Sequence, residues 1–227
     1  MTAALGRPRL HLRETPSTND RARALAAGGA PHGALVTAGM QTAGRGRQGR
    51  TWAAPPGQAL LLSLLLRDYD PLLPLRAGLA VADLAGEQAL VKWPNDVLVG
   101  GRKLAGILVE ARPEEGWAVL GIGVNVAVDL AALPPEVRDR AATLGRSPVE
   151  LESTLSELLV ALERRLAEPP AACLAALRVR DALRDQPVRW AEGEGTGAGI
   201  DDTGALLVRL PGGTLQTLAA GEVHLAR

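Results

Sequence analysis

The stretch Gly44-Arg45-Gly46-Arg47-Gln48-Gly49-Arg50-Thr51-Trp52 alternates arginine with glycine between two apolar segments and ends on a tryptophan. Glycine lets the backbone adopt positive φ and come close to a ligand, while arginine offers a planar set of donors that matches carboxylate and phosphate oxygens. Such a loop can hold an anionic small molecule. The same composition also suits a solvated basic loop or a nucleic-acid contact, so the rest of the chain has to decide between them.

The segments around this loop predict the strands of one sheet. Residues 34–38 lead into the loop, and residues 60–66 after it are apolar on both faces, which is typical of a sheet that is covered on both sides. Farther along, Gly100-Gly101 and residues 113–116 separate apolar runs and predict two hairpins.

The last strand of this sheet, residues 117–128, is interrupted by Gly121, Gly123 and Asn125. Glycines and an amide inside a strand indicate that something approaches its backbone closely. Apolar residues at helical spacing predict helices in the segments 21–27, 74–90, 151–166 and 171–183.

The composition changes after Arg184. Short strand-like runs separated by turns, such as Asp202-Thr203-Gly204 and Pro211-Gly212-Gly213, fill the remaining residues. We therefore predict a small β-barrel domain in residues 185–227. It should pack on a larger domain of residues 1–184, because so short a unit buries little surface by itself.

The bulk composition narrows the function classes. Lys+Arg and Asp+Glu both number 25, so no overall field attracts nucleic acid or a membrane surface, and any basic site must be local. The single Cys173 excludes a disulfide framework within the chain and a cysteine-rich zinc site. Since no apolar run reaches about 18 residues and the N-terminus has no signal-like core, we expect a cytoplasmic protein without a membrane span.

Three separated motifs occur in a fixed order. They are Ser17-Thr18-Asn19, the extended loop 41–52, and Lys92-Trp93-Pro94-Asn95-Asp96 with the segment 102–110. Together they resemble the biotin–protein ligase family, and the segments 121–126, 199–207 and 221–223 are similar to that family's glycine-rich strand and C-terminal barrel. The resemblance covers nearly the whole chain. It implies an α+β fold, with a mixed β-sheet and helices on one side as in class II synthetases, followed by a small Src-homology-3-like β-barrel.

The resemblance also implies roles for the site residues. The catalytic residues would be Lys103, Arg45, Arg47 and Asp96. The biotin-binding residues would be Ser17, Thr18, Asn19, Gln41, Gly44, Arg45, Gly46, Arg47, Lys103 and Gly106. The nucleotide-binding residues would be Arg47, Arg50, Trp52, Asn95, Lys103 and Asn125. The metal ligands stay open, and capping of the helix that starts here is the alternative role of Ser17, Thr18 and Asn19.

By the same resemblance, ATP and biotin are the substrates, with Mg²⁺ on the phosphates. Biotin would be converted to biotinyl-5′-AMP with release of pyrophosphate, then passed to a lysine of a biotin carboxyl carrier protein domain of acetyl-CoA carboxylase or a related carboxylase. The first step joins two anions, so electrostatic clamping and positioning must supply most of the catalysis. Asp96 is the candidate proton acceptor in the second step, and a turn carboxylate bonded to nearby backbone is its equal alternative.

Partners follow from the same comparison of motifs. Only 16 residues precede Ser17, too few for a helix-turn-helix unit, so we expect a monofunctional ligase that does not bind DNA by that route. A homodimer formed by aligned sheet edges, with the strand in residues 117–128 as one candidate edge, is compatible with the resemblance.

Three other functions remain open. Lipoate–protein ligase shares the adenylation chemistry, but the motif at residues 92–96 favours biotin. Nucleic-acid binding through the arginine loop is disfavoured by zero net charge and 2% aromatic residues. A catalytically inactive member of the family would bind biotin without forming AMP, so biotin-dependent AMP formation separates it from an enzyme.

Overall fold

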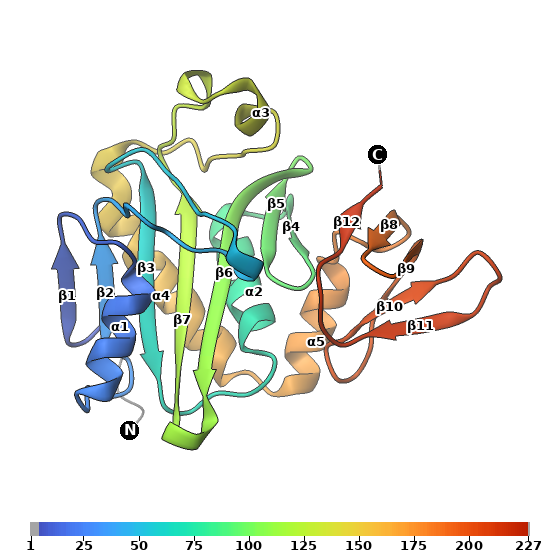
Figure 1. Cartoon of the computed structure of the whole chain (residues 1–227), viewed down its shortest axis with the longest axis horizontal. Coiled ribbons are helices and arrows are strands. Elements are labelled where there is room, and N and C mark those ends of the chain that lie inside the picture. Colours follow the sequence, from blue (N-terminus) through green and yellow to red (C-terminus); the bar gives the residue numbers. More distant parts are fainter. Residues whose placement is uncertain (1–4, 227) are drawn as a thin grey trace.

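The computed structural model of this chain describes residues 5–226 (Figure 1). One group of strands is β1 (Arg9–Leu12), β2 (Leu35–Ala38), β3 (Ala59–Leu66), β4 (Ala89–Lys92), β5 (Asp96–Val99), β6 (Arg102–Arg112) and β7 (Trp117–Asn125). The later strands are β8 (Pro187–Trp190), β9 (Gly193–Ile200), β10 (Leu206–Arg209), β11 (Leu215–Leu218) and β12 (His224–Leu225). The helices are α1 (Thr18–Ala27), α2 (Leu73–Ala85), α3 (Pro135–Arg138), α4 (Leu151–Ala167) and α5 (Pro170–Val179).

These strands form two sheets. The large sheet has the order β1-β2-β3-β7-β6-β5-β4, and the small sheet has the order β11-β10-β9-β8-β12. β1 and β2 are parallel, whereas the other strand pairs within residues 5–226 are antiparallel. The predicted mixed sheet and the predicted C-terminal β unit are therefore confirmed, and the two predicted hairpins are β5–β6 and β6–β7.

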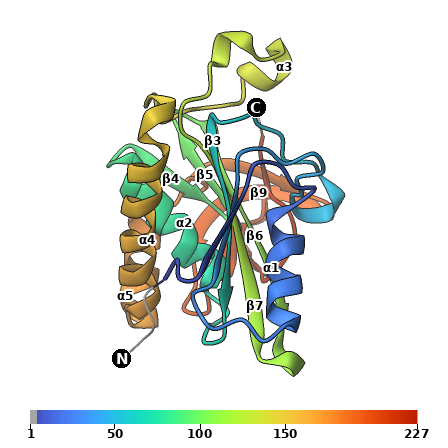
Figure 2. The ribbon, with the colours of Figure 1, turned by 90° about the vertical axis from the view of Figure 1, so that its left-hand side faces the viewer.

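Helices cover both faces of the large sheet, as Figure 2 shows. α2, α4 and α5 lie on one face, as predicted, and α1 lies alone on the other. The alternation of side chains along β3 explains this arrangement, since Leu64 packs with the α2 and α4 side chains while Leu65 packs with Ala22 of α1. Because β3 is apolar on both faces, each face needs a helix to cover it. The prediction of helices on one side of the sheet therefore holds for α2, α4 and α5 but not for α1.

β7 lies in the middle of the large sheet. It is hydrogen-bonded to β3 along one side and to β6 along the other. The expectation that this strand offers a free edge for a homodimer is therefore wrong, because the backbone groups that would pair with a second chain are already paired. The end strands of this sheet are β1 and β4.

The small sheet packs against the helices that cover one face of the large sheet and shares their core. Leu206 and Val208 of β10 belong to the same cluster of buried side chains as Leu75 of α2, and Trp93 Nε1 donates a hydrogen bond to the carbonyl oxygen of Gly204 at 3.1 Å. The division into domains of residues 1–184 and 185–227 remains a proposal, and residues 1–4 and 227 lie outside the described residues. None of the helices described is long and apolar enough to span a membrane.

Candidate active site

A pocket opens on the α1 face of the large sheet, beneath the loop that precedes β3. We call residues 44–52 of this loop the Arg/Gly loop. The lining includes Ser17, Thr18, Asn19, Gln41, Arg45, Gly46, Arg47, Arg50, Trp52, Asn95, Lys103 and Gly106 from the predicted set. The fold thus gathers residues from α1, the Arg/Gly loop, the β4–β5 turn and β6 into one site. Of the predicted site residues, Gly44, Asp96 and Asn125 lie outside this lining.

Two glycines of β7 form the floor of the pocket. Gly121 and Gly123 occupy the strand face on which Trp117, earlier in the same strand, packs with α1. A Cβ atom at Gly121 would overlap the side-chain amide of Asn19, and one at Gly123 would overlap the indole of Trp52. This confirms the close approach predicted for the strand, because two side chains rest directly on its backbone.

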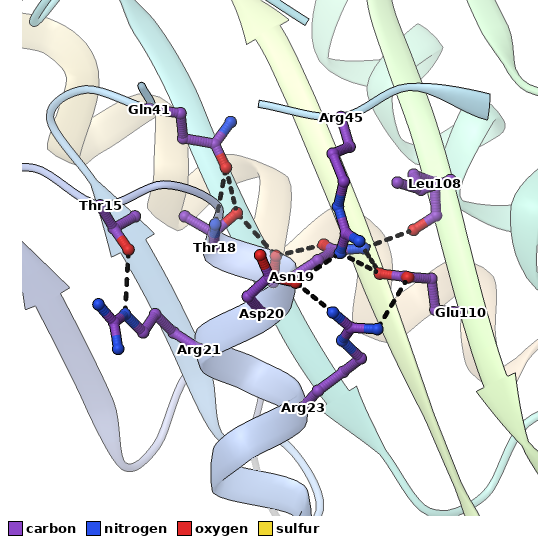
Figure 3. Close-up of polar contacts among 11 residues, drawn as sticks. Thr15, Thr18, Asn19, Asp20, Arg21, Arg23, Gln41, Arg45, Leu108 and Glu110 are labelled. Atoms are coloured by element: carbon purple, nitrogen blue, oxygen red, sulfur yellow. Dashed lines mark hydrogen bonds and ion pairs between the residues drawn. The ribbon is translucent and has the colours of Figure 1, made fainter. Parts of the chain in front are cut away.

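Uncharged groups line one end of the pocket (Figure 3). Gln41 Oε1 accepts hydrogen bonds from the Thr18 backbone N–H at 2.7 Å and from the Thr18 hydroxyl at 3.0 Å. Ser63 Oγ donates to Asn19 Oδ1 at 2.6 Å and lies 2.8 Å from Thr18 Oγ1. Ser17 occupies the N-cap position of α1, as the capping alternative predicts, but its side chain makes no capping hydrogen bond, and the residue lines the pocket.

A cluster of four charged residues closes the same side of the pocket. Arg45 Nη2 donates to Asp20 Oδ1 at 2.7 Å and to Glu110 Oε2 at 3.1 Å, and Arg23 pairs with the same two carboxylates (Figure 3). Arg45, expected to clamp an anion, is thus already held by protein carboxylates, and its catalytic role stays a prediction. Sequence analysis does not identify Asp20 or Glu110 as site residues, although Asp20 directly follows one motif and Glu110 ends another.

Lys103 lies at the opposite end of the pocket. Its Nζ is 2.7 Å from Asp96 Oδ1 and 5.6 Å from the centre of the Trp52 ring. Lys92 Nζ lies 3.8 Å from the other Asp96 oxygen, and burial lowers the pKa of Lys92 while the Asp96 charge opposes that shift. Asp96 therefore binds two ammonium groups, an arrangement that orients Lys103 toward the pocket.

Arg47 and Arg50 extend this cationic end. Arg47 Nη1 donates to Asn95 Oδ1 at 3.4 Å, and Asn95 Nδ2 donates to the Ile107 carbonyl at 3.0 Å, so Asn95 joins the Arg/Gly loop to β6. Arg50 forms an ion pair with Glu222 of the small β unit. Glu222 is another residue that sequence analysis does not place at the site, because its contact with Arg50 spans the two sheets.

The remaining predicted residues support the site from outside its lining. Asn125 Nδ2 donates to the carbonyl oxygen of Ala142 at 2.9 Å, which holds the segment after α3 against the end of β7. At Gly44, a Cβ atom would overlap the carbonyl oxygen of Trp52, so only glycine fits where the two ends of the Arg/Gly loop meet. The ligand contacts proposed for Asn125 and Gly44 stay predictions.

Two buried N–H donors in the pocket have no hydrogen-bond partner within residues 5–226. They are Arg45 Nε and Trp52 Nε1. Buried donors in folded proteins are nearly always paired. Unpaired donors among the lining residues of a pocket suit the binding of a ligand that has acceptor atoms.

Comparison with known proteins places this geometry in context. Residues 12–127 match the model of the biotin/lipoate A/B protein ligase family, and residues 182–225 match that of the biotin protein ligase C-terminal domain. The biotin--[acetyl-CoA-carboxylase] ligase of Mycobacterium tuberculosis is 37% identical over 93% of this chain and 87% of its own length. The bifunctional ligase/repressor BirA of Bacillus spizizenii is 32% identical over 99% of this chain and 76% of its own length.

A solved structure shares the fold. Biotin protein ligase from Aquifex aeolicus, determined in complex with biotin and ATP, superposes with a TM-score of 0.83 at 28% identity, over 97% of this chain and 99% of the other. The match covers both the large sheet and the small C-terminal β unit.

Proposed function

The chain belongs to the biotin/lipoate A/B protein ligase family, and from this premise we propose that it is a biotin–[acetyl-CoA-carboxylase] ligase. It activates biotin with ATP to biotinyl-5′-AMP and transfers the biotinyl group to a lysine of a biotin carboxyl carrier protein domain. One observation carries this proposal: hydroxyl and amide groups line one end of the pocket and Lys103, Arg47 and Arg50 line the other, with two unpartnered N–H donors among the lining residues.

The uncharged end suits the neutral ureido ring of biotin. Ser17, Thr18, Asn19 and Gln41 supply hydroxyl and amide groups there, and Ser63 holds two of them in place. A site that hydrogen-bonds a substrate through buried polar groups rejects an analogue without those partners. This end therefore favours biotin over lipoate, whose ring has no N–H or C=O group.

In the first step, a carboxylate oxygen of biotin attacks the α-phosphorus of ATP. The bond to the bridging β-phosphate oxygen breaks, and pyrophosphate leaves with the electron pair. Lys103 and Arg47 hold the biotin carboxylate and the α-phosphate of ATP, and Arg50 contacts the β- and γ-phosphates. The positive charges of these three side chains offset the repulsion between the two anions. Mg²⁺ bound to ATP would shield the phosphate charges and so reduce the repulsion between the two anions.

In the second step, the carrier lysine amine attacks the acyl carbon of biotinyl-5′-AMP, AMP leaves, and the new amide loses a proton. Asp96 is the proposed acceptor of that proton. The residues proposed to contact the nucleotide are Trp52, Asn95 and Asn125. The Arg/Gly loop covers the intermediate. A closed loop matters here because a mixed anhydride hydrolyses when water enters.

Biotin-dependent exchange of labelled pyrophosphate into ATP tests the activity. We expect exchange with biotin and Mg²⁺, and none with lipoate or without an acid. Exchange with lipoate alone would assign the chain to the other branch of the family. Absence of exchange with both acids, from folded protein, would contradict the proposed enzyme.

A further inference from the structure

The Arg/Gly loop is a small hairpin whose two halves are joined by backbone hydrogen bonds. The Gly46 N–H donates to the Arg50 carbonyl at 2.7 Å, and the Trp52 N–H donates to the Gly44 carbonyl at 2.9 Å. These two bonds join the outgoing and returning halves of the loop. These bonds connect Arg50 to the part of the loop that carries Trp52, whose ring lies against Gly123 on the pocket floor.

This hairpin is tied down on two sides. On the α1 side, Arg45 is bound by Asp20 and Glu110. On the other side, Arg50 is bound by Glu222, which lies between β11 and β12. The tip of the hairpin also faces the small β unit, because Gln48 lines a hollow together with residues 218 and 220–224.

Glu222 is placed for this contact. Its side chain is 20% exposed, whereas that of Arg50 is 49% exposed, so the small β unit shields the carboxylate more than the loop shields the guanidinium. His224 Nε2 lies 3.4 Å from the same Glu222 oxygen. A partly shielded pair is less weakened by solvent than a pair between two fully exposed side chains.

We propose that Glu222 is a positioning residue of the ligase and that, through Arg50, the small β unit holds the Arg/Gly loop closed over the adenylate. This inference rests on the proposed function and extends it, because it gives the C-terminal unit a specific part in the reaction. When the ion pair is intact, the loop retains biotinyl-5′-AMP until the carrier lysine arrives. When it is lost, the loop opens more often and the adenylate escapes to water.

The test compares two rates in the purified full-length chain without carrier. One is pyrophosphate exchange, which reports formation of the adenylate, and the other is release of AMP, which reports its escape and hydrolysis. We expect Glu222→Gln to raise AMP release about threefold to fivefold, while exchange at saturating substrates changes less than about twofold. Loss of fold alone would lower both rates together.

Glu194→Gln is the matched control. Glu194 forms a 3.1 Å pair with Arg189 in the same small sheet and does not contact the loop, so this variant should retain the adenylate as the wild type does. Equal AMP release from the two variants would overturn the proposed role of Glu222 in holding the loop closed. Absence of biotin-dependent exchange in the wild type would overturn the proposed function instead.

Arg50→Gln tests the same contact from the loop side if Glu222→Gln does not fold. It should show the same increase in AMP released per exchange event. Because Arg50 is also proposed to contact the phosphates, its variants are compared by the AMP released per exchange event. This ratio should be no higher in the double variant than in Arg50→Gln, because both changes break one interaction. Additive increases in the ratio, or an unchanged ratio in Arg50→Gln, would overturn the inference.

Discussion

At the scale of single residues, Lys103 carries the clearest expectation. Its ammonium group is fixed by Asp96 at 2.7 Å, faces the pocket and lies over Trp52. Lys103→Ala should lower biotin-dependent pyrophosphate exchange by about 10²-fold or more, because the charge proposed to act on the reacting phosphate is lost. Circular dichroism should show an unchanged fold.

The neighbouring Arg102 provides the control for that variant. It is exposed and lies outside the pocket lining, so Arg102→Ala should exchange pyrophosphate at nearly the wild-type rate. Near wild-type exchange by Lys103→Ala would contradict the role proposed for Lys103.

At the scale of secondary-structure elements, Asp83 joins α2 to α4. Arg165 Nε and Nη2 donate to the Asp83 carboxylate at 2.7 and 2.8 Å, and Arg164 donates to it at 2.8 Å. Burial by itself would raise the pKa of Asp83, but the bonds from Arg165 and Arg164 outweigh it and hold the pKa below its usual value. The folded state therefore binds a proton at Asp83 less readily than the unfolded chain does.

The sign of the pH effect follows from this lowered pKa. The stabilisation is complete above the unfolded pKa of about 3.8 and is lost as the pH falls through the lower folded value. Asp83→Asn should reduce the free energy of unfolding by about 2 kcal/mol near pH 7, measured by urea titration. The difference from the wild type should shrink below about pH 3.8, and a difference that stays constant down to pH 2 would contradict this account.

At the scale of the whole molecule, Gly204 marks the junction between the two sheets. A Cβ atom there would lie 2.5 Å from Leu72 Cδ2 and 3.2 Å from Leu75 Cδ1, and the residue has φ = +89°. Gly204→Ala should therefore destabilise the chain through both overpacking and backbone strain.

Gly213 separates these two effects, because it has nearly the same φ, +86°, with no atom near the added Cβ. Gly213→Ala should show the backbone cost alone. We expect Gly204→Ala to lose about 1–2 kcal/mol more free energy of unfolding than Gly213→Ala, measured by urea titration. An equal loss of free energy of unfolding in the two variants would mean that the Leu72 and Leu75 side chains move away from the added methyl group without cost.

The sequence by itself determined the family and most of the local structure. The motifs at residues 17–19, 41–52 and 92–96 indicate the ligase fold, and the alternation of apolar and turn residues predicts the strands and hairpins. These signals are local, since they depend on backbone preferences and on side chains a few residues apart. Twelve of the predicted site residues line one pocket. The motifs single out these residues, and the fold brings them together.

Only the tertiary structure decided which charges meet. Arg45 binds Asp20 and Glu110, and Arg50 binds Glu222, in pairs separated by up to 172 positions along the chain. It also decided that β7 is a central strand and that α1 lies alone on the site face of the sheet. Ion pairing depends on distance in space, and strand order depends on how the whole sheet closes, so neither is encoded in a short window of sequence.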